Sequence, residues 1–135
     1  MIQLLETEHP IQRLSSVVTM QDMLNAQEHV QRVYVDPKVR QYILQIVHET
    51  RGHSELALGG GPRATIALFR ASQAMAAIRG RAFAQPDDVK RIVGPVLAHR
   101  LILRPESRLR RQTAEQILDA IVAEISVPTL EEPAR

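Results

Sequence analysis

Residues 59–63, three glycines followed by a proline and an arginine, are the part of the sequence whose residue types could do chemistry. Glycine-rich segments that open a helix often bind phosphate, because bare backbone amides can approach the oxygens closely. A P-loop also needs a lysine and a hydroxyl residue directly after the last glycine, and an acidic strand that holds magnesium. The lysines, Lys38 and Lys90, follow Pro37 and Val89 instead. The chain by itself therefore cannot form a P-loop nucleotide site.

Arg63 permits a narrower phosphate-binding role. Pro62 suits the first position of a helix, so Arg63 is expected in the first turn, where free amides and the helix dipole attract anions. The planar guanidinium could reach a terminal phosphate there and stabilise its charge during transfer. Gly61, Pro62 and Arg63 are therefore the candidate site residues. The alternative is a flexible helix entry in which Arg63 caps a neighbouring carbonyl or pairs with Glu55.

Other reactive side chains do not form recognisable sites. His48 and His53 stand on either side of an expected helix end, so they would diverge, and zinc needs three or four convergent ligands. We therefore expect no metal site. The serines lack the glycine elbow of a nucleophile, and the acidic pair at 87–88 is expected to cap a helix. The absence of cysteine excludes disulfides, thiolate zinc sites and cysteine catalysis.

The composition favours one helical domain. The 135 residues match the usual size of a single domain, and 44% of them are hydrophobic whereas only 3% are aromatic. The core must therefore come from leucine, isoleucine, valine and alanine, which suit helices. No apolar run reaches the roughly 20 residues that span a bilayer, and the amino end lacks the features of a secretory signal. We expect a cytoplasmic protein.

Caps and apolar periodicity predict five helices. The first is expected over about 20–32 after Thr19, with an apolar face that includes Met23 and Val30. The second follows Asp36 and runs to about residue 50, and the third begins at Pro62 and ends at Gly80. The apolar arc of the third helix is so wide that we expect burial on most sides. A fourth helix starts near residue 86, with a kink or a break at 94–95, and a fifth follows residue 113.

Two short segments have β propensity. Residues 33–35 and 101–103 are apolar triplets that could pair as a two-stranded ribbon. The segment before residue 19 has no sustained period, and the tail from residue 128 onward resembles a frayed end. The sequence thus indicates a lead-in at 1–18, a helical domain at 19–127 and a tail at 128–135.

A concentration of arginine leaves a second function open. Arginine accounts for most of the 17 basic residues, but 15 acidic residues bring the net charge to only +2. The densest basic group lies beside His99 and consists of Arg100, Arg104, Arg108, Arg110 and Arg111. Such a group favours either a solvated arginine face or a binding surface for nucleic acid or an acidic protein partner. The alternative to a nucleotide-responsive domain is therefore a separate helical binding module.

An ordered series of short motifs resembles the carboxy-terminal lid of MoxR-type AAA+ ATPases. The resemblance covers about residues 10–128, and the series is more specific than any single motif. Its members are Thr50-Arg51-Gly52-His53, Leu58-Gly59-Gly60-Gly61-Pro62-Arg63-Ala64, Arg79-Gly80-Arg81, Pro86-Asp87-Asp88-Val89 and Val96-Leu97-Ala98-His99-Arg100-Leu101. The resemblance implies a helical AAA+ lid bundle of four to five helices, with a short two-stranded ribbon at most.

The resemblance assigns Arg63 a role. In that family the arginine of a Gly-Ala-Ser-Pro-Arg motif is the sensor-2 residue, which contacts nucleotide, and it aligns with Arg63. The chain departs from the motif at Gly60-Gly61, where the family usually has Ala-Ser, and the departure removes a capping hydroxyl. Arg51, His99 and Arg100 also lie in family motifs, and we expect them to be structural or to lie where the lid meets the ATPase core.

The resemblance also implies what surrounds the domain. Residues 14–18 are similar to the end of a preceding ATPase core, so the chain resembles a fragment without its own P-loop. ATP and magnesium would bind only in the intact ATPase, and the fragment alone would bind neither and be inactive. The implied partners are the ATPase core of the same chain, neighbouring subunits of a ring and a client protein that is assembled or matured. We expect no membrane partner, and nucleic acid is the less favoured one.

Overall fold

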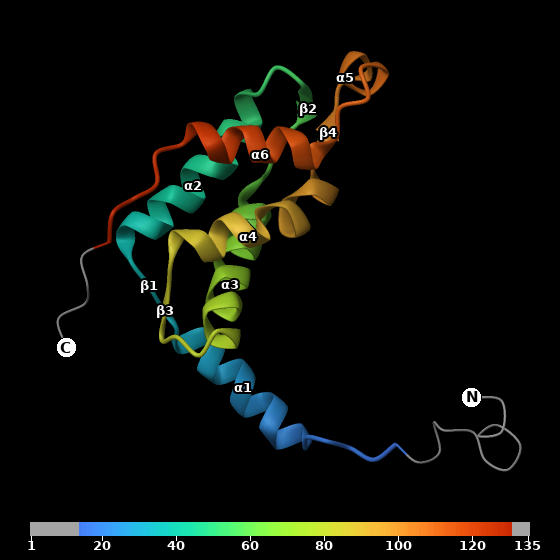
Figure 1. Cartoon of the computed structure of the whole chain (residues 1–135). Helices are drawn as coiled ribbons and strands as arrows, with labels where there is room; N and C mark the ends of the chain where they lie inside the picture. Colours follow the sequence, from blue (N-terminus) through green and yellow to red (C-terminus); the bar gives the residue numbers. More distant parts are fainter. Residues whose placement is uncertain (1–13, 131–135) are drawn as a thin grey trace, which may run out of the picture.

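The computed structural model describes residues 14–130, and most of them lie in helices (Figure 1). The α-helices in this range are α1 (Met20–Arg32), α2 (Pro37–Gly52), α3 (Pro62–Ile78), α4 (Pro86–Leu97), α5 (Pro105–Leu109) and α6 (Ala114–Glu124). The mainly α fold class is thus confirmed. The five-residue helix α5 was not predicted, because a single turn leaves no apolar period in the sequence.

The predicted helix starts are confirmed by their caps. The Thr19 hydroxyl accepts from the Asp22 amide, and the Asp22 carboxylate accepts from the Thr19 amide. Thr113 and Gln116 form the same reciprocal box at α6. The Asp36 carboxylate accepts from the Lys38 amide in front of α2. Each box satisfies backbone groups that the first turn leaves unpaired, so these starts can be read locally.

The core lies between α2, α3, α4 and α6 (Figure 1). Its fully buried hydrophobic side chains are aliphatic apart from Tyr42, as the composition required. The largest of them are Tyr42, Ile43, Ile46, Leu68, Leu97 and Leu118. Because the cluster draws on all four helices, removing any one of them would expose the apolar faces of the others.

Burial of α3 is less extensive than its apolar arc predicted. Leu68 is fully buried, but Ile66 is 61% and Ile78 80% exposed. The expectation that α3 is covered on most sides therefore holds along most of the helix, and it fails at an exposed strip through Arg63, Ile66 and Arg70 and at the end near Ile78. Phe69, Ala71, Met75 and Ala77 pack partly against the core, so the exposed apolar side chains of α3 are confined to the strip and the helix end.

Two short strand pairs replace the single ribbon that was expected. β1 (Tyr34–Val35) pairs in parallel with β3 (Phe83–Ala84), and β2 (Leu56–Leu58) pairs antiparallel with β4 (Ile102–Leu103). The predicted pairing of residues 33–35 with 101–103 is therefore wrong. The true partners, β2 and β3, are short stretches next to polar loops, which carry too few residues to show alternation.

α4 continues through Gly94 and Pro95 as one helix and ends at Leu97, so a break into two α-helices is not observed. The proline lies in the last turn, where its missing amide costs a single backbone bond. A 3-10 turn, η3 (Ala98–Arg100), follows directly. The helix begins at a buried carboxylate: Asp88 is 0% exposed and receives two hydrogen bonds, 2.6 and 2.9 Å long, from the Arg81 guanidinium.

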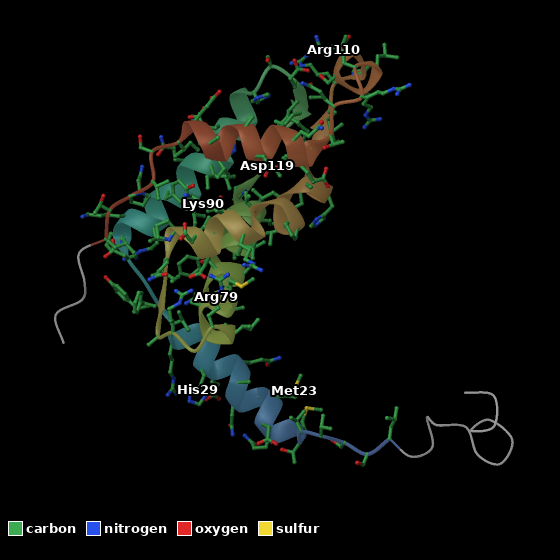
Figure 2. All side chains as sticks on the ribbon, in the orientation of Figure 1. Met23, His29, Arg79, Lys90, Arg110 and Asp119 are labelled. Atoms are coloured by element: carbon green, nitrogen blue, oxygen red, sulfur yellow. The ribbon has the colours of Figure 1, made fainter. Side chains whose placement is uncertain are left out.

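The first helix of the described chain has no buried residue, whereas the last described residue packs against the core. α1 extends away from the bundle (Figure 1), none of its residues is buried, and Figure 2 shows Met23 far from the other helices. At the other end, residues 126–130 have no regular structure, but Leu130 packs against the core. The lead-in up to residue 13 and the tail from residue 131 lie outside the described residues, so only parts of the predicted end segments can be placed.

Candidate functional site

The amino end of α3 is open to solvent. Gly61 is the N-cap, with extended backbone angles and no side chain that could cap the helix, and Pro62 occupies the first turn as predicted. Gly61 and Pro62 are both exposed. The first amides of a helix have no partner within the helix, and the dipole places partial positive charge there. Pro62 has no amide hydrogen and the Ala64 amide donates to the Gly61 carbonyl, so this end of α3 attracts an anion mainly through the positive field of the helix.

Arg63 lies in that first turn and is exposed. Within residues 14–130 its guanidinium forms no ion pair or side-chain hydrogen bond. Glu55, the partner that the alternative interpretation gave it, binds Arg110 instead, through contacts of 2.6 and 2.8 Å. The alternative in which Arg63 pairs with Glu55 is therefore wrong. The permanently charged, planar guanidinium of Arg63 can therefore bind an anion that lies outside the domain.

The glycines before α3 are bound to the end of α2. The Thr50 hydroxyl accepts a 2.8 Å hydrogen bond from the Gly60 amide, and the Arg51 Nε donates a 2.7 Å hydrogen bond to the Gly60 carbonyl. Gly59 lies so close to this helix end that a Cβ atom there would stand 2.4 Å from the Thr50 carbonyl oxygen. Sequence reasoning singled out the Thr50-Arg51 motif but could not show this contact, because hydrogen bonds between residues ten apart leave no periodic signal.

The basic group at 100–111 is partly neutralised by the fold. Glu55 precedes β2, and its side chain meets Arg110 and Ser107 beyond β4, so it links the two strands of the β2–β4 pair. Figure 2 shows Arg110 beside α5, beyond this strand pair. The Arg104 amide also donates to the Glu55 carbonyl. Arg110 is therefore committed to an internal pair, whereas Arg100, Arg104, Arg108 and Arg111 are exposed.

Acid should loosen the contact between Glu55 and the segment that follows β4. The hydrogen bond from Ser107, together with the Arg110 guanidinium, holds the pKa of Glu55 below its usual value of 4.5. A lowered pKa means that the stabilisation is complete above the unfolded pKa and is lost as the pH falls through the folded one. Amide exchange in residues 101–112 should therefore accelerate relative to the core as the pH is lowered from roughly 6 to 3, after correction for intrinsic rates. Glu55→Gln should abolish this dependence, and an unchanged dependence would contradict it.

Two of the serines and the buried carboxylate have structural partners. Asp88 is held by Arg81, the Ser72 hydroxyl donates to the Phe69 carbonyl, and Ser107 donates to Glu55. Among residues 14–130 no three histidine or acidic side chains gather in a way that could hold a metal ion. In the same range no helix combines the length and apolar character needed to cross a membrane.

Comparisons with known proteins agree with this arrangement. The family model described as "AAA lid domain" matches residues 48–121, which is more than half of the chain and includes α3 with its entry loop. A crystal structure from Cytophaga hutchinsonii, of a protein provisionally described as an ATPase, superposes with a TM-score of 0.81 at 26% identity. The superposition covers 85% of this chain and 38% of the other.

Curated relatives also match most of this chain over only a part of their own length. The uncharacterized protein YeaC of Bacillus subtilis is 37% identical over 127 residues, which is 94% of this chain and 40% of YeaC. The chaperone MoxR1 of Mycobacterium tuberculosis is 26% identical over 83% of this chain and 32% of its own length. The chain thus spans less than half of the relatives that it matches. It belongs to the AAA lid domains, as found in the MoxR family of AAA+ ATPases.

Proposed function

We propose that this chain is the nucleotide-responsive lid of a MoxR-type ATPase and that Arg63 is its sensor-2 residue. In the intact ATPase, ATP with magnesium would bind to a separate core, and Arg63 would contact the terminal phosphate. Gly61 and Pro62 would contribute by opening the helix without bulk. The lid by itself would have no ATPase activity.

The observation that carries this proposal is the state of Arg63. It is exposed, it has no ion-pair partner among residues 14–130, and it stands in the first turn of a 17-residue helix whose N-cap has no capping side chain. The guanidinium and the partial positive charge at the start of α3 are therefore not neutralised by the described residues. Together they favour binding of an anion that another part of the protein holds. Other arginines, such as Arg91, are also exposed, so the feature that distinguishes Arg63 is its place in the first turn of α3.

The exposed apolar surface supports docking on a further body. Ile66 lies three residues after Arg63, so the two share one side of α3, and Ile66 is 61% exposed. On α1, Met20 is 76% and Met23 52% exposed, although the helix is amphipathic. Isolated exposed apolar side chains are ordinary, but a whole helix without buried residues needs a partner to be stable in water. The ATPase core of the same protein would supply that partner.

Hydrolysis would then move the lid as one body. While the terminal phosphate is present, Arg63 would tie α3 to the core, and its release would remove the tie. The core between α2, α3, α4 and α6 makes the lid rigid enough to transmit this change. By analogy with the relative named a chaperone, the motion would act on client proteins within a ring of subunits.

Nucleotide-dependent amide exchange tests the proposal directly. In a protein that joins this lid to its ATPase core, a non-hydrolysable ATP analogue should slow exchange in residues 62–66, because Arg63 then holds the first turn against the phosphate. Arg63→Ala should remove this protection while the core still binds the analogue. Equal exchange with and without the analogue, in a protein shown to bind it, would contradict the sensor-2 role.

A further inference from the structure

Two residues at the end of α2 bind the backbone that introduces α3. Thr50 is fully buried, and its hydroxyl both donates to the Val47 carbonyl, at 2.6 Å, and accepts from the Gly60 amide, at 2.8 Å. The Arg51 Nε donates to the Gly60 carbonyl at 2.7 Å. Both polar backbone groups of Gly60 are therefore bonded to consecutive residues of one helix. We call Thr50 and Arg51 the glycine clamp.

The packing around the glycines agrees with a fixed, not a flexible, loop. A Cβ atom on Gly59 would lie 2.4 Å from the Thr50 carbonyl oxygen, and one on Gly60 would lie 3.0 Å from Val47 Cγ1. A Cβ atom on Gly61 would meet nothing within 4 Å. The first two glycines are thus pressed against α2, and the chain becomes free only at the N-cap of α3. This arrangement contradicts the earlier expectation of a flexible helix entry.

We propose that Thr50 and Arg51 are positioning residues for Arg63. Gly60 precedes Arg63 by only three residues, and Pro62 between them has a restricted backbone. The Gly61 carbonyl accepts from the Ala64 amide at 2.9 Å, so a shift of Gly60 is passed through Gly61 to the first turn of α3 and moves the Arg63 guanidinium. The clamp ties that guanidinium to the end of α2, so the two helices present it to the phosphate as one unit. This inference rests on the proposed sensor-2 role.

The hydroxyl of Thr50 provides a sharp test. In the lid joined to its ATPase core, Thr50→Val keeps the shape of the side chain but leaves the Gly60 amide without its acceptor, whereas Thr50→Ser keeps the hydroxyl. We expect the valine variant to lower kcat for ATP roughly tenfold with little change in KM, since a misplacement of about 1 Å can cost up to about 100-fold. The serine variant should restore most of kcat. Ser72→Ala, which removes another fully buried hydroxyl that donates only to a carbonyl of its own helix, is the matched control.

Combining the variants separates this inference from the proposed function. If Thr50 acts through Arg63, Thr50→Val should cause no further decrease when Arg63 is already alanine. A decrease that is equal in both backgrounds, or a serine variant as slow as valine, would overturn the positioning role while leaving the sensor-2 role intact. An Arg63→Ala protein with unchanged turnover would instead overturn the proposed function itself.

Arg51 gives a second variant that leaves the core untouched. Its side chain is exposed, so Arg51→Ala should fold normally and remove only the bond to the Gly60 carbonyl. In the 135-residue chain, Thr50→Val and Arg51→Ala should each accelerate amide exchange of residues 59–64 severalfold relative to α6, because the glycine backbone loses a hydrogen-bond partner. Exchange as slow as in the parent chain would show that these bonds do not hold the turn and would refute the clamp.

Discussion

Arg63→Ala, in a protein that joins the lid to its ATPase core, is expected to slow ATP turnover at least about tenfold, because an arginine that stabilises phosphoryl-transfer charge contributes 10³–10⁵ in other systems. The guanidinium has no ion pair or side-chain hydrogen bond within residues 14–130, so its removal breaks no polar interaction inside the lid. The melting temperature of the 135-residue chain should therefore stay within experimental error of the parent value. Steady-state ATP hydrolysis and thermal unfolding together measure both effects.

Two further variants show whether charge or geometry matters at this position. Arg63→Lys keeps the charge but loses the planar fork, so it should recover only part of the turnover. Arg91→Ala removes another exposed arginine, on α4, and should leave turnover unchanged. Equal losses in Arg63→Ala and Arg91→Ala would indicate a general effect of net charge. That result would remove Arg63 from the nucleotide site.

Leu68→Ala is expected to lower the free energy of unfolding of the 135-residue chain by about 2–5 kcal/mol, the range for truncating a buried leucine. Leu68 is 0% exposed and lies on the side of α3 that faces the core. The substitution removes apolar contacts and leaves a cavity that the surrounding helices can only partly fill. Urea unfolding followed by circular dichroism measures the change.

Neighbours of Leu68 on α3 are the controls for this prediction. Ile66→Ala should change the free energy of unfolding by less than about 0.5 kcal/mol, as exposed positions usually do, because Ile66 is 61% exposed. Phe69 is only partly buried, so Phe69→Ala should destabilise less than Leu68→Ala. If Ile66→Ala and Leu68→Ala lowered the free energy of unfolding equally, the side of α3 that carries Leu68 would not be the buried one.

Local features made much of this fold predictable. Thr19 with Asp22 and Thr113 with Gln116 form caps within four residues of chain, and apolar side chains three or four apart identify the helix faces. The same local logic placed Arg63 in a first turn after Pro62, and the ordered motifs gave the family. Each of these features depends on neighbours in sequence, which is why the residues alone could indicate them.

Contacts between distant residues required the tertiary structure. The sequence could not show that β1 pairs with β3 and β2 with β4, because strands of two or three residues carry no register information. It could not show which part of the apolar arc of α3 stays exposed, since the period of a helix says which residues share a face but not what covers that face. Nor could it show that Thr50 and Arg51 hold Gly60. A hydrogen bond across a loop depends on where two helices come to lie, and only the packing of the whole core decides that.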